Sequence, residues 1–497
     1  MAADEIELHP YYSLLPSYVT RNSVERERDE FVERVRETLT ALQQLRDGVE
    51  SVRLQKRHFR VVDTVYKLKH VLPKELHLQL IEALVWHLWE QDARCIVDVD
   101  MEVRAVQALR LLLHKWCVKR PLVERNEVSL DWRLAKRAVD RVCFSASGQA
   151  RLASPVTLQL LASTMIKSVE AARPLFTAGV GNSVVGELWG VFSPAIGETK
   201  SNECFRALGF FTILLNVGKP EESEQEWNAI ETLIPQWLKA WATISRCTDW
   251  DGHWFKVFSR VAKHYPQQTQ RVLRDAMPFL FAKLHDMLEL PSDLGSPFKN
   301  KAWPSAFSIL HGSKRFDQHA TRLCTYLLDN QDESGATAPG NQYVVELLTT
   351  IKPFFHPSNA SRAANSVGIT VYYLTSMISK RLGVEKGSKS VLKIESCRGI
   401  FDALLQIAFY GIYSKDRSVA SKCMYMIKSL VCVDPVYCAR PVLDEMIKAL
   451  DPRALSQSHM APAAISSLSV FLYHLMCGQG PDNVGLVFQR ILLHSFA

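Results

Sequence analysis

Glycine is scarce in this chain, with 22 residues in 497, against a usual share of about 7%. Long apolar runs are also missing. The most apolar one, from Ala207 to Val217, is far shorter than the roughly 20 residues that a membrane-spanning helix needs. The acidic start of the chain lacks the apolar run of a signal peptide. We therefore expect neither a turn-rich β architecture, nor a membrane span, nor a secretory leader.

Neither sign of charge dominates, since 59 basic and 52 acidic residues leave a formal charge of +7. A chain that binds nucleic acid should concentrate its basic residues on one face, so we expect no direct nucleic-acid binding. The 11 cysteines show no paired spacing, and residues such as Cys423 and Cys477 fall in apolar stripes. They are typical of reduced core cysteines, which favours a cytosolic or nuclear protein.

Helical periodicity fills most of the chain. Apolar residues recur at steps of three and four, as in the stripe Leu76, Leu80, Leu84 and Leu88, and prolines separate the stripes. The spacing predicts about ten to twelve helix pairs with a period near 40 residues, as in HEAT and armadillo repeats. The expected fold is all-α, a HEAT/armadillo-like α-solenoid of antiparallel helix hairpins without a sheet.

The expected organisation is simple. Residues 1–24 carry no helical period and should form an extended segment, and residues 25–497 should form one helical-repeat array. Gly, Pro and Ser gather at three places in the array, which predicts mobile loops at 291–304, 329–341 and 383–390.

The most distinctive stretch is the turn Phe354-Phe355-His356-Pro357-Ser358-Asn359. An apolar stripe precedes it (Val344, Leu348, Ile351, Phe355) and another follows it (Val367, Val371, Leu374, Ile378). Pro357 should end the first helix and push His356 out of the helical region. Ser358 and Asn359 should cap the second helix. The sequence predicts a tight, specific turn between two helices.

This turn, followed by a helix that ends in Lys380-Arg381, resembles the signature of the large HEAT-repeat proteasome activator family. Three further places resemble the same family: Leu130-Asp131-Trp132-Arg133, then Arg173-Pro174-Leu175-Phe176 with Trp189, and Asp249-Trp250-Asp251 followed by Trp254 and Phe258. The likeness extends from about residue 14 to beyond 450 in such islands. It covers what would be the N-terminal part of those long activators.

The resemblance implies a non-catalytic, ATP-independent cap on the proteasome core particle that promotes entry of peptides and proteins. It also implies nuclear and cytoplasmic localisation, a role in DNA repair and histone degradation, and acetylated histones as further partners. Family members end in a hydrophobic–Tyr–any-residue tail, whereas this chain ends in His494-Ser495-Phe496-Ala497. We therefore expect a fragment or truncated product that binds the core particle weakly and does not stimulate peptide hydrolysis alone.

We find no pattern that predicts an enzyme, a cofactor or a metal site. Cys423, Cys432 and Cys438 lack the Cys-x-x-Cys pairs of zinc sites. Asp98, Asp100 and Glu102 lack the closing residues of a calcium loop and are typical of an acidic helix N-terminus. His356 has Phe, Pro and Ser as neighbours, which favours a structural role over a catalytic one. The family-signature residues Phe355, His356, Pro357, Ser358 and Asn359 are therefore expected to be structural.

Two other functions stay open at this stage. A generic HEAT-repeat adaptor or transport receptor would share the fold and bind cargo or a small GTPase. A nucleic-acid or chromatin-binding module could use the basic stretches at 56–60 and 114–120, although solvated helix faces explain them better.

Overall fold

The computed structural model describes residues 21–49, 54–68, 72–90, 98–114, 127–144, 155–177, 183–199, 203–218, 223–288, 316–330, 337–357, 359, 362–385, 392–450 and 460–477. Within these ranges the chain is helical and contains no strand, so the expected all-α solenoid is confirmed. No helix of these ranges is both long and apolar enough to cross a bilayer.

The chain divides into two compact units. Unit 1 comprises Met1–Ile234 and Lys301–Ser313, and unit 2 comprises Pro235–Asn300 and Lys314–Ala497. The division falls inside helix α9 (Ser223–Ala242), at Pro235, which has no backbone N–H to donate to the helical ladder.

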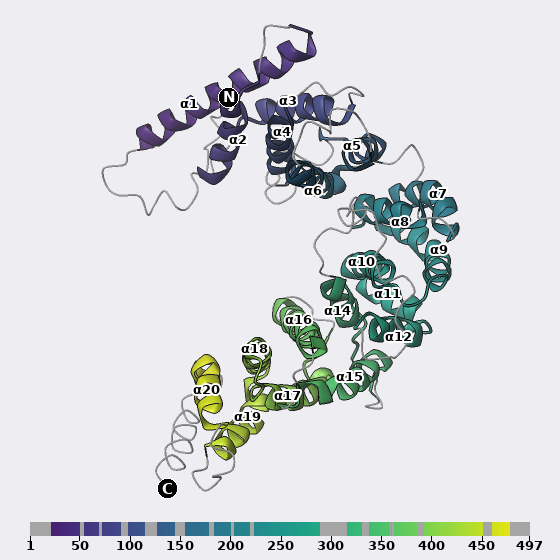
Figure 1. Ribbon diagram of the computed structural model, residues 1–497, viewed down its shortest axis with the longest axis vertical. Helices are drawn as coiled ribbons and strands as arrows, with labels where there is room; N and C mark the ends of the chain where they lie inside the picture. Colours follow the sequence, from purple (N-terminus) through teal and green to yellow (C-terminus); the bar gives the residue numbers. More distant parts are fainter. Residues whose placement is uncertain are drawn as a thin grey trace. The chain divides into compact units, whose positions relative to one another are not determined.

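Unit 1 is built of two rows of helices. One row contacts in the order α2, α4, α6, α8, and α1, α3 and α5 pack beside it, as Figure 1 shows. The π-helical turn η2 (Trp86–Glu90) continues α3, and the 3₁₀ turn η6 (Arg173–Leu175) continues α6. The α-helices of unit 1 before α9 are α1 (Arg21–Arg46), α2 (Lys56–Leu68), α3 (Lys74–Val85), α4 (Val99–Leu111), α5 (Trp132–Phe144), α6 (Pro155–Ala172), α7 (Val184–Gly197) and α8 (Glu203–Leu214).

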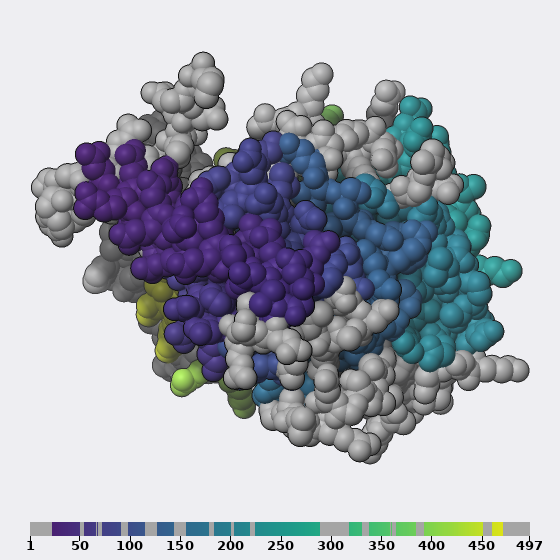
Figure 2. Space-filling view, turned by 90° about the horizontal axis from the view of Figure 1, so that it is seen from above, coloured from purple at the N-terminus to yellow at the C-terminus, as the bar shows by residue number. Residues whose placement is uncertain are grey.

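Helix α1 lies on the outside of this unit, as a long ridge beside the helices that follow it (Figure 2). It begins at Arg21, four residues before the predicted start. One face is buried through Val35, Leu39 and Leu42. The preceding residues 1–20 lie outside the described part, so the extended segment expected over 1–24 stays a prediction for them.

Unit 2 repeats the two-row arrangement. Helices α10, α14, α16, α18 and α20 contact one another in sequence, and α12, α15, α17 and α19 form the second row (Figure 1). The helices of unit 2 are α10 (Thr248–His264), α11 (Pro266–Leu273), α12 (Met277–Met287), α14 (Phe316–Tyr326), α15 (Pro339–Ile351), η8 (Lys352–Phe355), α16 (Arg362–Glu385), η9 (Glu395–Cys397), α17 (Arg398–Gly411), α18 (Arg417–Val433), α19 (Pro435–Ala449) and α20 (Met460–Cys477).

Two of the expected loops need new boundaries. The loop 329–341 ends earlier, because α15 already begins at Pro339, the first-turn position that proline favours. The loop 383–390 begins later, because α16 continues to Glu385. The loop 291–304 lies outside the described residues.

Acidic residues begin several helices by accepting backbone hydrogen bonds. Asp98 accepts from the Asp100 N–H at 2.9 Å, and Asp100 and Glu102 lie in the first turn of α4. Asp416 and Asp434 cap α18 and α19 in the same way. The Asp98–Glu102 stretch is therefore a helix N-terminus, as predicted.

Candidate functional site

The His-Pro turn is held by the ring of Phe355. This residue is only 1% exposed. Its ring packs against one glycine of α16 and one glycine of α17. A Cβ added at Gly411 of α17 would lie 3.2 Å from the Phe355 ring, and one added at Gly368 of α16 would lie 3.8 Å from it. The two glycines thus make room for the ring, which anchors the turn between α16 and α17.

The α-helix before the turn ends earlier than predicted. Helix α15 stops at Ile351, and Lys352–Phe355 form a 3₁₀ turn with Pro353 in its first positions. Proline at 353 cannot donate the next α-helical hydrogen bond, so the α-helical ladder stops before Pro357. The prediction for His356 is confirmed, because its ψ of 136° is extended.

Only one member of the predicted capping pair lies in the described part of the chain. Ser358 lies outside the described residues. Asn359 lies three positions before the first residue of α16, Arg362, and its backbone N–H donates to the His356 carbonyl at 2.8 Å. This bond closes the turn, and capping of α16 by the Asn359 side chain stays a prediction.

The outer side of the turn carries an exposed aromatic and cationic group of side chains. His356 is exposed, and its ring lies 6.2 Å from that of Tyr410 on α17. Lys352 donates to Gln406 Oε1 at 2.9 Å and lies 5.2 Å from the Tyr410 ring centroid. These residues fix the turn to α17 but bring no acid, base and nucleophile together.

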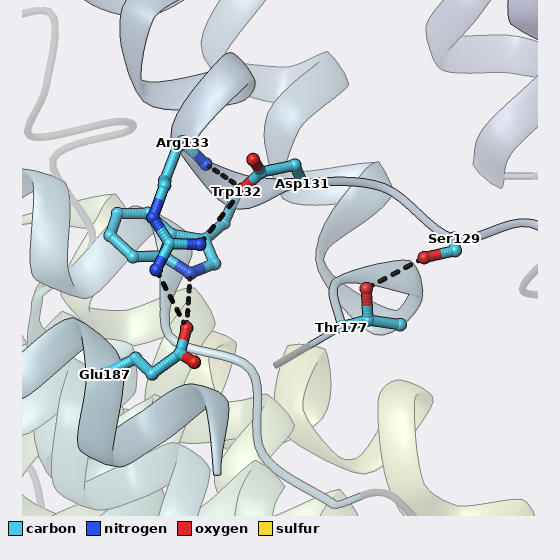
Figure 3. A network of polar contacts seen from close by, with 6 residues as sticks. All are labelled: Ser129, Asp131, Trp132, Arg133, Thr177 and Glu187. Carbon is cyan, nitrogen blue, oxygen red and sulfur yellow. Dashed lines mark hydrogen bonds and ion pairs between the residues drawn. The ribbon is translucent and has the colours of Figure 1, made fainter. Parts of the chain in front are cut away.

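The second and third resemblance islands meet in unit 1. Leu130 and Phe176 form an isolated parallel bridge, and the Leu130 N–H donates to the Leu175 carbonyl at 3.2 Å. Beside them the Ser129 and Thr177 hydroxyls are hydrogen-bonded at 2.8 Å (Figure 3). The bridge joins the residues before α5 to the end of η6.

Glu187 of α7 binds the first two residues of α5, which follow this bridge in the chain. Figure 3 shows Trp132 and Arg133 both directed at its Oε2 atom, at 3.4 Å and 3.3 Å. Trp132 is 1% exposed and its ring lies 6.3 Å from that of Phe192. This island is a buried joint between α5 and α7.

The fourth island forms the aromatic core at the start of unit 2. Trp241, Trp250, Trp254 and Phe258 are fully buried. Asp251 lies among them and accepts hydrogen bonds from Trp241 Nε1 at 2.7 Å and from Lys283 Nζ at 3.1 Å. Burial raises the pKa of Asp251 to about 6, although Lys283 and Trp241 act in the opposite direction.

The three cysteines considered for a metal site differ in burial. Cys423 and Cys438 are buried and Cys432 is exposed. Burial raises the pKa of the Cys423 and Cys438 thiols to about 12. The described part of the chain contains no group of three potential His, Cys, Asp or Glu metal ligands.

Comparison with known proteins relates the chain to one family. A model of the mid HEAT-repeat region of proteasome activator complex subunit 4 matches residues 344–480, which include the His-Pro turn. Proteasome activator complex subunit 4 of Xenopus laevis is 20% identical over 97% of this chain and 25% of its own length. The human protein of that name is 21% identical over 79% of this chain and 21% of its own length. The Arabidopsis thaliana subunit is 22% identical over 65% of this chain and 18% of its own length. Over most of its length the chain is therefore similar to proteasome activator complex subunit 4.

This relationship bears out the sequence resemblance and refines it. Residues 344–480 correspond to the middle HEAT region of the activator family, and the chain spans about a quarter of the length of the Xenopus relative. The sequence shows the islands but not the residues that pack against them. Gly368, Gly411 and Glu187 carried no signal of their own, because their roles depend on which helices become neighbours.

Proposed function

We propose that the chain is a non-catalytic scaffold of the proteasome activator type, which docks on the proteasome core particle and promotes entry of peptides and unfolded proteins. The observation that carries this proposal is the likeness to activator subunits over 97% of the chain. The relatives bear the name of a regulator, which supports a role without chemistry of its own. We further propose that the action is ATP-independent.

The architecture supports a scaffold function. Stacked helical repeats expose extended surfaces on which a large partner can dock. The islands of resemblance to the activator family hold neighbouring helices together through Phe355, Trp132 and the Trp241 cluster. They therefore preserve the shape of the scaffold.

The test uses purified proteasome core particle with this chain. We expect weak binding, unchanged by removal of ATP, and no stimulation of fluorogenic peptide hydrolysis by the chain alone, because it matches only about a quarter of the length of a relative. A full-length activator serves as the positive control. Failure of the chain to associate at any concentration that saturates the control would reject the proposal.

Nuclear and cytoplasmic localisation, with a role in histone degradation and DNA repair, belongs to the same proposal. We expect a tagged chain in both compartments and association with acetylated rather than unmodified histone peptides. Steeply salt-dependent binding to DNA would instead favour a nucleic-acid module. Binding to a small GTPase without affinity for proteasomes would favour a transport adaptor.

A further inference from the structure

A groove of about 480 Å³ lies between α16 and α18 in unit 2. One face of α16 and one face of α18 line it, and both follow helical spacing. The α16 residues are Tyr372, Ser376, Ser379, Lys380 and Gly383, and the α18 residues are Tyr425, Lys428, Ser429, Cys432 and Val433.

Small side chains hollow this surface. Ser376, Ser379 and Gly383 of α16 and Ser429 of α18 all line it, and the Ser379 hydroxyl donates to the Ser429 carbonyl at 3.5 Å. Nearer the start of both helices, Lys422 donates to Asn365 at 2.8 Å. The two bonds occur in the same order along both helices, so α16 and α18 run in the same direction.

The parallel course orders the groove along its length. Tyr372 precedes Lys380 by about two helical turns on α16, and Tyr425 precedes Lys428 by about one turn on α18. Tyr425 is 48% exposed. Along the groove, the two tyrosines therefore come first and the two lysines follow.

The two neighbouring basic residues of α16 have different roles. Arg381 turns to α14, where it donates to the Thr325 and Leu328 carbonyls and lies 5.5 Å from the Tyr326 ring centroid. Lys380 lines the groove instead. Among the described residues no carboxylate forms an ion pair with Lys380 or Lys428, so both ammonium groups are available to an anionic ligand.

We propose that this groove binds an acidic segment of a partner polypeptide, in which two carboxylates lie next to an aromatic side chain. Lys380 and Lys428 would bind the carboxylates through charge-assisted hydrogen bonds, and the exposed ring of Tyr425 would pack on the aromatic residue. The proposal does not depend on proteasome binding. It names a second surface of the scaffold and the chemistry of its partner.

Nucleic acid fits this groove less well. A duplex contact neutralises several phosphates with a stripe of basic residues, whereas this groove offers two lysines. The other lining residues are uncharged: two tyrosines, three serines, a glycine, a cysteine and the apolar Val433, which suits a polypeptide.

The experiment measures fluorescence anisotropy of a short fluorescein-labelled peptide with glutamates around one tryptophan, added to the full chain. Lys380→Glu and Lys428→Glu should each weaken binding about tenfold, the loss of one hydrogen bond to a charged group. Lys415→Glu is the matched control, because Lys415 is exposed in the turn before α18, outside the groove. Tyr425→Ala should weaken binding, whereas Tyr425→Phe should retain it.

A second measurement locates the peptide. Cys432 lines the groove and is exposed, so bound peptide should slow its alkylation by a maleimide, as followed by peptide mapping. The glutamine version of the peptide should neither bind nor protect.

Three results would overturn the proposal: equal binding by wild type and the Lys380→Glu/Lys428→Glu variant, equal weakening by Lys415→Glu, or tighter binding of a DNA oligonucleotide than of the peptide. Thermal unfolding of each variant, matched to that of wild type, excludes misfolding as the cause of lost binding.

Discussion

At the residue scale, the packing around Phe355 gives the first prediction. Phe355→Ala removes a ring that is 1% exposed, and we expect it to lower the free energy of unfolding by about 3–5 kcal/mol. His356→Ala changes an exposed neighbour and should cost about 0.5 kcal/mol or less. Urea denaturation followed by circular dichroism measures both. A larger effect at His356 than at Phe355 would contradict the assignment of Phe355 as the anchor.

The glycine that faces this ring gives a second prediction. In Gly411→Ala the new Cβ would lie 2.2 Å from Cys423 Sγ, and we expect a loss of about 1–3 kcal/mol from overpacking. Adding Cys423→Ala removes the sulfur and should restore part of that loss. If the double variant is no more stable than Gly411→Ala alone, the contact with Cys423 is not the cause.

Asp251 gives a prediction on pH. Its folded-state pKa of about 6 is above the ordinary value of 3.8, so the folded state binds the proton more tightly than the unfolded state. The stability that this group contributes is therefore fully present below about pH 4 and is lost as the pH rises to about 6. The total is on the order of 3 kcal/mol, because each tenfold change in proton affinity corresponds to about 1.4 kcal/mol.

The measurement compares wild type with Asp251→Asn/Lys283→Met, which removes both members of the buried pair. The free energy of unfolding of wild type minus that of the variant should fall between pH 4 and pH 6. A difference that is constant or rises over this range would show that Asp251 does not titrate as described.

At the scale of elements, Arg381 joins α16 to the end of α14. Arg381→Ala removes hydrogen bonds to the Thr325 and Leu328 carbonyls, and we expect a loss of about 1–3 kcal/mol, as for hydrogen bonds to a charged group. Lys380→Ala, the adjacent and exposed residue, is the control and should change stability by about 0.5 kcal/mol or less. Thermal unfolding distinguishes the two, and equal effects would contradict the division of roles.

The helices themselves were largely predictable from sequence. The stripes Val344–Phe355 and Val367–Ile378 are buried as expected, because burial of one helix face requires steps of three and four. The predicted end of α15 rests on Pro357, whereas Pro353, four residues earlier, already ends the α-helical ladder. The link between Leu130 and Phe176 could not be predicted, since a bridge between residues 46 positions apart depends on how α5 and α6 pack.

At the scale of the whole molecule, a destabilising substitution in one unit should increase local unfolding in that unit alone. In a stacked array each repeat is stabilised by its neighbours, and native proteins open in cooperative units. We expect Phe355→Ala to raise amide hydrogen exchange in α15–α18 and to leave exchange in α2–α5 unchanged. Trp132→Ala should raise exchange in α2–α5 and leave exchange in α15–α18 unchanged. Mass spectrometry of exchange under native conditions measures this. Uniform loss of protection in either variant would indicate one cooperative unit.

The row-by-row stacking also has a consequence for synthesis. Contacts that join neighbouring elements connect residues close in sequence, such as Trp132 with Glu187 at 55 positions and Arg206 with Asp140 at 66. Such low contact order favours rapid folding. A helix leaving the ribosome would wait for fewer than about 70 further residues before its partner emerges, or a few seconds at about 20 residues per second. The apolar face of each new row would be exposed only briefly to chaperones and to other nascent chains.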